Sequence, residues 1–267
     1  MKNISFYLSL LKFSLLHPKS GINLINEANQ VHDDDTQKFK NFDYDPVDLS
    51  LALKLITDNQ IDFKNTSLEI NNLKKHLESF FKNLSGDYPS NTKPYPIDYS
   101  ISGDSGPLLY NLCKFVKPEI IIETGVAYGV SSSYILQALN ENNKGKLISI
   151  DSIFRPWQSK KMIGAAIPKN LLDRWELKIG TSEKMLNEIF SKFPSIDIFL
   201  HDSLHTYKNM SLEFKKSWPF INSGGFLLSD DVLNNNAFSD FYTSIKKEPI
   251  IMIQDKKPVS YLGILKK

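Results

Sequence analysis

Acidic side chains and a histidine gather at two places in the second half of the sequence. Asp202 and His205 belong to the first place, and the pair Asp230-Asp231 forms the second. Carboxylates that share one site repel each other unless a cation or protons intervene. Hard oxygen ligands without cysteine favour Mg²⁺, with Mn²⁺ or Ca²⁺ as alternatives, and Asn234 could add a carbonyl oxygen. The alternative interpretation is that these aspartates cap helices, a common position for this residue type.

His205 is the titratable candidate for proton transfer. An imidazole changes its charge near neutral pH, which suits a general base. A surface histidine at the start of a helix is an equally good interpretation of the same residue. Both interpretations stay open at the level of single residues.

A glycine-containing turn precedes both acidic segments. It starts at Glu123 and contains Gly125 and Gly129, and Asp151 follows further along the chain. A dinucleotide fingerprint would read G-x-G-x-x-G, whereas the spacing here is G-x-x-x-G, and Glu123 would repel a pyrophosphate. A carboxylate suits a cationic ligand end such as an amino group, and Asp151 could accept hydrogen bonds from both ribose hydroxyls. The combination favours S-adenosylmethionine over NAD, with glycines that serve only packing as the alternative.

Alternating strands and helices must bring these residues together. Helices are expected between most of the predicted strands, which are short apolar runs at 119–123, 146–150, 175–179, 196–200, 226–229, 249–253 and 259–265. This alternation predicts an α/β fold, a Rossmann-like doubly wound sheet of about seven strands. The short connection between the two closing strands predicts that the last strand runs antiparallel. Ligands of such sheets bind beyond the carboxyl ends of the strands, where the candidate residues lie.

The N-terminal region has a different composition. Residues 1–95 are rich in Asn, Lys and Asp, and helices are predicted at 48–57 and 68–84. The alternating leucines at 49–55 would also fit a strand, but Leu, Ala and Lys favour a helix. The three aspartates at 33–35 are interpreted as a solvated loop. A stretch punctuated by prolines marks a boundary, which divides the chain into a mainly helical extension over 1–95 and a second domain over 96–267.

The first 16 residues form an apolar segment. It predicts a helix that packs on the domain or on a second subunit, and a peripheral membrane contact is the less favoured interpretation. Lys12 and the following His17-Pro18-Lys19 argue against a signal peptide. No run of about 18 uncharged apolar residues occurs, so a transmembrane helix is not expected.

The composition limits which binding partners and which cellular compartment are expected. The chain has 267 residues, with 32 Lys and Arg against 30 Asp and Glu, which gives a net charge of +2. Without a dense basic stripe, nucleic acid is not an expected partner. The single Cys113 excludes a disulfide framework within the chain and a multi-cysteine zinc site, and it fits a reducing, cytoplasmic compartment. The expected partner is a small molecule, and a homo-oligomer stays open.

The sequence from about residue 100 to 267 resembles the class I S-adenosylmethionine-dependent methyltransferases. It is similar to metal-dependent O-methyltransferases of the catechol O-methyltransferase type and to relatives that methylate sugars of macrolides and aminocoumarins. The resemblance lies in the first motif at 121–131, the adenine segment at 180–182 and the two metal segments at 200–202 and 228–232. His205-Thr206-Tyr207 is like the His-Ser-Tyr of the sugar-modifying branch.

The resemblance implies a role for individual residues. Cofactor binding would fall to Glu123, Gly125, Gly129, Ser131, Asp151, Ser182 and Asp202. The cation would be bound by Asp202, Asp230 and Asp231. His205 would take the proton, although the catechol enzymes have a lysine at its position.

The activity implied by the resemblance is methyl transfer to a hydroxyl. S-adenosylmethionine would supply the methyl group, and Mg²⁺ or another divalent cation would orient a hydroxyl of a small molecule or sugar. Two alternatives remain: an inactive cofactor-binding or scaffold protein of the same fold, and an NAD-linked enzyme. The N-terminal 95 residues resemble no known family.

Overall fold

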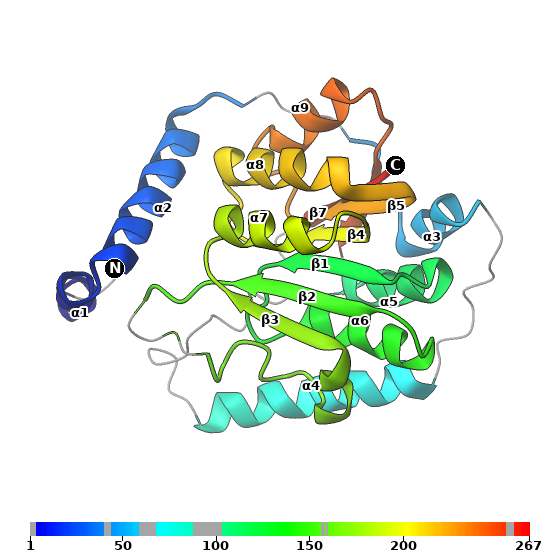
Figure 1. The fold of residues 1–267 in the computed structure, drawn as a ribbon, viewed down its shortest axis with the longest axis horizontal. Coiled ribbons are helices and arrows are strands. Elements are labelled where there is room, and N and C mark those ends of the chain that lie inside the picture. Colours follow the sequence, from blue (N-terminus) through cyan, green and yellow to red (C-terminus); the bar gives the residue numbers. More distant parts are fainter. Residues whose placement is uncertain are drawn as a thin grey trace.

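The computed structural model describes residues 4–39, 44–58, 68–87, 103–155, 158, 160–254 and 259–267. In this part of the chain, seven strands form one sheet of order β3-β2-β1-β4-β5-β7-β6 (Figure 1). The strands are β1 (Ile120–Thr124), β2 (Lys146–Asp151), β3 (Trp175–Ile179), β4 (Ile196–His201), β5 (Ile221–Ser229), β6 (Ile250–Gln254) and β7 (Ser260–Lys266). β1 to β5 are parallel, and β7 is antiparallel to both of its neighbours. The predicted α/β sheet with a reversed last strand is therefore confirmed.

β5 is longer than the sequence pattern predicts. Residues 221–225, which precede the predicted strand at 226–229, belong to β5 as well, and its pairing with β4 shifts register between Ile196 and Ile198. Such an irregularity allows Gly224 and Gly225 to lie within β5 although the pairing with β4 is interrupted there.

Helices cover both faces of the sheet (Figure 1). One core includes residues of α3 (Leu49–Ile56), α4 (Leu68–Asp87), α5 (Ser105–Val116) and α6 (Val130–Glu141). The other includes residues of α7 (Ser182–Lys192), α8 (Tyr207–Ser217) and α9 (Ala237–Ser244), and the short 3₁₀ helices are η2 (Lys169–Arg174) and η3 (Trp218–Phe220). Successive strand residues face opposite cores, because side chains alternate along a strand: Ile121 belongs to the first core and Ile122 to the second.

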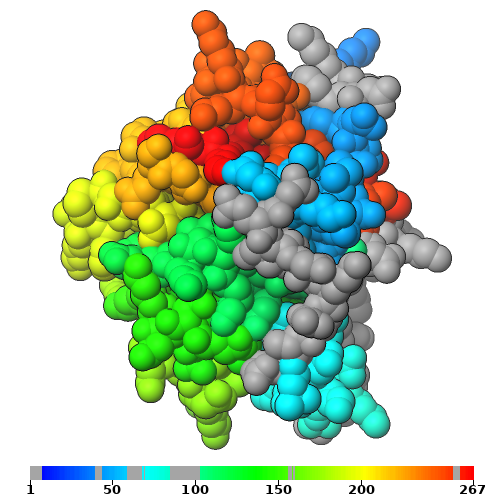
Figure 2. All heavy atoms as spheres, turned by 90° about the vertical axis from the view of Figure 1, so that its right-hand side faces the viewer, coloured from blue at the N-terminus to red at the C-terminus, as the bar shows by residue number. Residues whose placement is uncertain are grey.

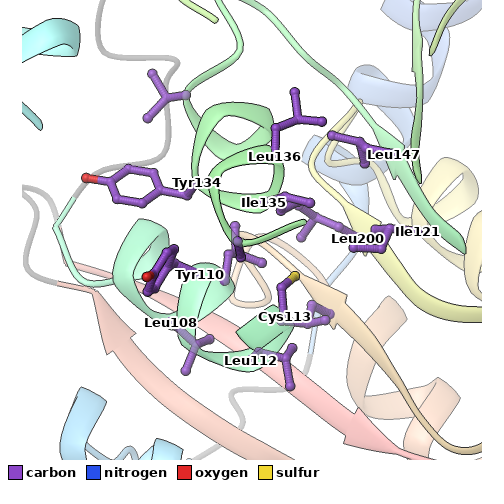
Figure 3. Close-up of a cluster of buried hydrophobic side chains, with 14 of the residues drawn as sticks. Leu108, Tyr110, Leu112, Cys113, Ile121, Tyr134, Ile135, Leu136, Leu147 and Leu200 are labelled. Atoms are coloured by element: carbon purple, nitrogen blue, oxygen red, sulfur yellow. The ribbon is translucent and has the colours of Figure 1, made fainter. Parts of the chain in front are cut away.

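The first core joins α5 and α6 to the middle of the sheet. Figure 3 shows Leu108, Leu112 and Cys113 of α5 near side chains of α6 such as Ile135, with Ile121 of β1 beside them. All five side chains are at most 1% exposed. This packing fixes the start of α6 relative to the end of β1, which is where the glycine-containing turn lies.

The two helices predicted in the N-terminal region are confirmed. Asp48 caps α3, since its carboxylate accepts a hydrogen bond from the backbone N–H of Leu51 at 2.8 Å. Val47 hydrogen-bonds with the main chain of β6 on both sides of Met252, and Figure 2 shows α3, in blue, beside the red and orange C-terminal part of the chain. α3 and α4 therefore share a core with the sheet. The predicted boundary at residue 95 lies outside the described residues, and the division into two domains stays a prediction.

The beginning of the chain forms two helices, α1 (Ile4–Leu16) and α2 (Pro18–Thr36). The prediction of a loop at 33–35 was wrong, because these aspartates form the last turn of α2, where Asp34 is held by a contact with α8 that a local pattern cannot reveal. α1 packs on α2, and Leu8, Leu11 and Leu15 are exposed. Within the described ranges, every helix is too short or too polar to cross a membrane.

Candidate active site

The carboxyl ends of the central strands lie level with one another. Thr124 of β1 pairs with Ile150 of β2 and with His201 of β4, and His201 pairs with Ser229 of β5. The ladder continues one residue further: the backbone N–H of Asp202 donates to Thr124 at 2.8 Å and that of Asp230 donates to His201 at 2.9 Å. Asp202 and Asp230 therefore follow adjacent strands at the same height, next to the point where the strand order reverses.

Asp202, His205 and Asp230 converge at this edge. One ligand atom from each of them lies within 4.8 Å of the others. His205 Nε2 is 3.8 Å from an Asp202 oxygen, and His205 Nδ1 is 3.9 Å from an oxygen of Asp231. Asp230 is 4% exposed, and the other three side chains are partly buried. The structure thus brings together the residues predicted to bind the cation and the histidine predicted to act as a base.

The capping alternative for these aspartates does not hold. α8 has Thr206 as its N-cap, and the Thr206 hydroxyl accepts from the N–H of Asn209. α9 has Asn236 as its N-cap. The aspartates are therefore not the caps of these two helices, and α8 begins at Tyr207, so that His205 lies in the loop before it.

A buried amide orients Asp230. Gln254, at the end of β6, is 1% exposed, and its Nε2 donates to Asp230 Oδ1. Gln254 Oε1 has no hydrogen-bond partner among the described residues. The sequence pattern did not identify Gln254, although a polar residue that ends the apolar run of β6 is a weak signal. Its amide fixes one carboxylate oxygen of Asp230.

A buried ion pair lies directly behind the cluster. Glu213 of α8 and His201 are both fully buried, with Glu213 Oε2 2.6 Å from His201 Nδ1. The same carboxylate accepts hydrogen bonds from Thr124 at 2.6 Å, Ser203 at 2.8 Å and Asn209 at 3.1 Å. Glu213 therefore ties the ends of β1 and β4 to α8, on either side of Asp202.

The charge on Glu213 is stabilised by its neighbours. Burial raises the pKa of Glu213, but the charge and the hydrogen bond of His201 outweigh it and bring the pKa down to about 2. An ionised carboxylate only accepts hydrogen bonds, so His201 Nδ1 must be the donor in this pair. Sequence reasoning missed Glu213, whose signal is an acidic residue beside Phe214 on the buried side of an amphipathic helix.

Both glycines of the predicted turn are required by close packing. Gly125 has φ +82°, and a Cβ there would lie 1.8 Å from the carbonyl oxygen of Asp202. Gly129 has φ +88°, and its Cβ would meet Gly164 and Ile167 at 2.9 and 2.8 Å. The turn after β1 thus lies against the chain after β4 and against the 164–167 segment. These contacts agree with the packing interpretation, and contact of the two glycines with a cofactor stays a prediction.

Glu123 lies under this turn and is surrounded by hydroxyl groups. Its carboxylate is fully buried and accepts hydrogen bonds from Ser131, Ser132 and Ser149 at 2.5, 2.6 and 2.6 Å. Burial raises the pKa of Glu123, and these three hydrogen bonds counteract the rise only in part. The predicted pair Glu123 and Ser131 is therefore in direct contact, and its contact with a cofactor stays a prediction.

Asp151 supports the same turn from the end of β2. Its Oδ2 accepts from the backbone N–H of Val126 at 3.1 Å and of Ala127 at 3.0 Å. Ser182, the first residue of α7, donates to Asn209 at 3.3 Å and so adjoins the Glu213 network. Asp151 thus lies beside the glycine turn and Ser182 beside α8, while the ribose and adenine roles predicted for them stay predictions.

Comparison with known proteins agrees with this arrangement. Residues 122–232 match the model of a family described as a methyltransferase domain. That segment contains the glycine turn, Asp151, Asp202, His205 and both aspartates after β5. No curated protein matches the sequence.

Solved structures share the fold at low sequence identity. An O-methyltransferase from Bacillus cereus in complex with SAH has 16% identity and a TM-score of 0.56, over 82% of this chain and 98% of that one. The O-methyltransferase TomG from Streptomyces achromogenes, in complex with SAM, has 14% identity and a TM-score of 0.54, over 76% of this chain and 90% of that one. A SAH-bound methyltransferase from Podospora anserina has 14% identity and a TM-score of 0.51, over 86% of this chain and 98% of that one. The matched segment and the shared topology agree with the resemblance: residues 122–232 are similar to a methyltransferase domain, and the chain has the fold of these O-methyltransferase structures.

Proposed function

We propose that this protein transfers the methyl group of S-adenosylmethionine to a hydroxyl of a small-molecule or sugar acceptor, with the help of a divalent cation. The observation that supports the proposal most is the convergence of Asp202, His205 and Asp230 within 4.8 Å at the carboxyl ends of β4 and β5. The carboxylates of Asp202 and Asp230, joined by the nearby Asp231, suit Mg²⁺ or Mn²⁺. The structural neighbours that carry SAM or SAH support the choice of cofactor.

The cofactor would lie along the turn after β1, next to Asp202. The residues proposed to surround it are Glu123, Gly125, Gly129, Ser131, Asp151, Ser182 and Asp202. When bound, it supplies a methyl group on a positively charged sulfur.

The cation would be held by Asp202, Asp230 and Asp231, and when bound it lowers the pKa of the acceptor hydroxyl and orients it. His205 takes the hydroxyl proton while the acceptor oxygen forms its bond to the methyl carbon and the carbon–sulfur bond breaks. His205 lies beside these carboxylates, since its two ring nitrogens are 3.8 and 3.9 Å from oxygens of Asp202 and Asp231.

A cytoplasmic location is part of the proposal. It rests on Cys113, which is a buried free thiol whose pKa is raised by burial. An unreactive thiol without a partner suits a reducing compartment.

Calorimetric titration tests the cofactor. We expect the full-length protein to bind S-adenosylmethionine and S-adenosylhomocysteine, because both would use the turn after β1, and to give no heat with NAD. Tight binding of NAD, or no binding of either sulfur nucleoside, would contradict the proposed function.

Substitution of His205 tests the proton acceptor. His205→Ala is expected to lower kcat by about 10²-fold, because the displaced proton loses its acceptor, while the Kd of S-adenosylmethionine changes little. Methyl transfer would be measured with an acceptor taken from a screen of vicinal diols. His32→Ala, at an exposed position of α2, is the matched control. Equal kcat values for His205→Ala and His32→Ala across pH 6–9 would remove His205 from this role.

A further inference from the structure

α2 is attached to the sheet edge by a polar stripe. Glu27, Gln30 and Asp34 are spaced by three and four residues, which places them on one face of the helix. Glu27 forms an ion pair with Arg155 in the segment after β2, and Gln30 Oε1 accepts from the Thr206 hydroxyl at 2.7 Å in the segment after β4. In Figure 1, α2 accordingly lies at the end of the sheet to which the parallel strands point.

The polarity of α2 is the reverse of that expected for a helix packed on its own domain. A surface helix normally turns its apolar side inward. Here the polar stripe faces the domain, while Ile22, Ile25 and Val31 are 57%, 61% and 43% exposed. Burial of apolar side chains therefore does not explain why α2 lies against the domain. The hydrogen bonds of Gln30 and Asp34 and the ion pair of Glu27 explain this position.

Asp34 differs from its two neighbours of the same type. Asp33 and Asp35 are exposed, whereas Asp34 is partly buried. Asp34 Oδ2 accepts from the backbone N–H of Tyr207 at 2.8 Å, in the first turn of α8. Three carboxylates in the last turn of a helix oppose its dipole, whereas one carboxylate at the first turn of another helix is favourable. Asp34 thus acts as a cap for α8 that is supplied by a different helix.

The contact of Asp34 reaches the main chain next to His205. Asn235, in the segment after β5, is 4% exposed and donates from Nδ2 to the carbonyl of His205 at 3.2 Å. The same Nδ2 lies 3.5 Å from Asp34 Oδ2, and Asn235 Oδ1 accepts from the N–H of Ala237 at 2.9 Å. The main chain at 205–207 is therefore held from one side by Asp34 and from the other by Asn235.

We propose that Asp34 is a positioning residue of the active site, which keeps the 205–207 segment in place and with it His205 beside Asp202 and Asp230. This gives a role to α2, which lies outside the segment 122–232 that matches the methyltransferase domain. The inference rests on the proposed function, because it takes Asp202 and Asp230 to bind the cation and His205 to act as the base beside them. Asp34 acts through the main chain of α8 and not through contact with the reacting atoms.

The three consecutive aspartates provide the experiment with its controls. Binding of Mn²⁺ and of S-adenosylmethionine would be measured by calorimetry for the full-length protein and for Asp34→Ala, Asp34→Asn, Asp33→Ala and Asp35→Ala. Asp34→Ala is expected to weaken Mn²⁺ binding by about 10-fold or more, because displacement of the 205–207 segment also disturbs the ligand Asp202, three residues before His205. Asp34→Asn keeps an oxygen that accepts from Tyr207 and should restore most of the affinity. Asp33→Ala and Asp35→Ala should bind Mn²⁺ like the wild type.

S-adenosylmethionine binding and thermal melting separate positioning from general destabilisation. A folded Asp34→Ala variant with weakened Mn²⁺ binding and nearly unchanged S-adenosylmethionine binding supports the inference. Wild-type Mn²⁺ affinity in Asp34→Ala, or an equal loss in Asp33→Ala, overturns it while the proposed function stands. Failure of the wild type to bind Mn²⁺ overturns the cation site and this inference together.

Discussion

Replacement of Glu213 by alanine is expected to lower the free energy of unfolding by about 3–5 kcal/mol, the range for breaking a buried ion pair from one side. Glu213 and His201 are fully buried, and the variant leaves His201 Nδ1 without its acceptor. The loss is smaller than the stability of a typical domain, so the variant should still fold. Chemical denaturation, followed by circular dichroism, measures the difference.

The stability that Glu213 contributes should depend on pH. Its pKa in the folded protein is about 2, below the ordinary value of 4.5. A lowered pKa means that the stabilisation is fully present above pH 4.5 and is lost as the pH falls from about 4.5 to about 2. The difference in unfolding free energy between the wild type and Glu213→Ala should therefore shrink over this range. A difference that is constant from neutral pH to pH 2 would contradict this account of the pair.

Glu176 is the matched control for Glu213. Its pKa is also lowered to about 2, by hydrogen bonds from Lys146 and Lys178. Its side chain is 32% exposed, and water screens an ion pair at such a position. Glu176→Ala should therefore cost at most about 1 kcal/mol. Equal losses for the two variants would mean that burial is not what makes the Glu213 pair important.

Replacement of Asp230 by asparagine is expected to abolish cation binding and methyl transfer. Asp230 is buried, belongs to the Asp202–His205–Asp230 cluster, and has one oxygen fixed by Gln254. Loss of a partner behind a metal ligand already costs about 10–100-fold in affinity, so the loss of a ligand carboxylate should weaken Mn²⁺ binding by more than about 100-fold. The Kd of S-adenosylmethionine should change little, because Asp230 follows β5 and the glycine turn follows β1.

The asparagine variant keeps the volume of the side chain. Its amide can still hydrogen-bond with Gln254, so a similar melting temperature is expected. Asp240→Asn, on the exposed part of α9, serves as the control. Turnover that survives both EDTA and the Asp230→Asn change would show that the reaction needs no cation at this place.

Much of the fold follows from local patterns in the sequence. Alternation of apolar runs with amphipathic segments predicted the strands, the reversed β7 and helices α3 and α4, because periodicity and the length of a connection are local properties. The convergence of Asp202, His205 and Asp230 also followed, since parallel strands end at the same edge of a sheet. The sequence did not decide whether these aspartates cap helices, because more than one residue near the start of each helix can act as an N-cap. The structure gives those caps to Thr206 and Asn236.

Contacts between distant segments could not be read from local patterns. Gln254 reaches Asp230 from β6, and Glu213 joins the ends of β1 and β4, because their strands and helices are neighbours in space and not in sequence. The aspartates at 33–35 are the clearest example. All three residues are aspartates, so the sequence does not distinguish them. Only Asp34 faces α8, because the packing of α2 against α8 determines which side of the helix points toward Tyr207.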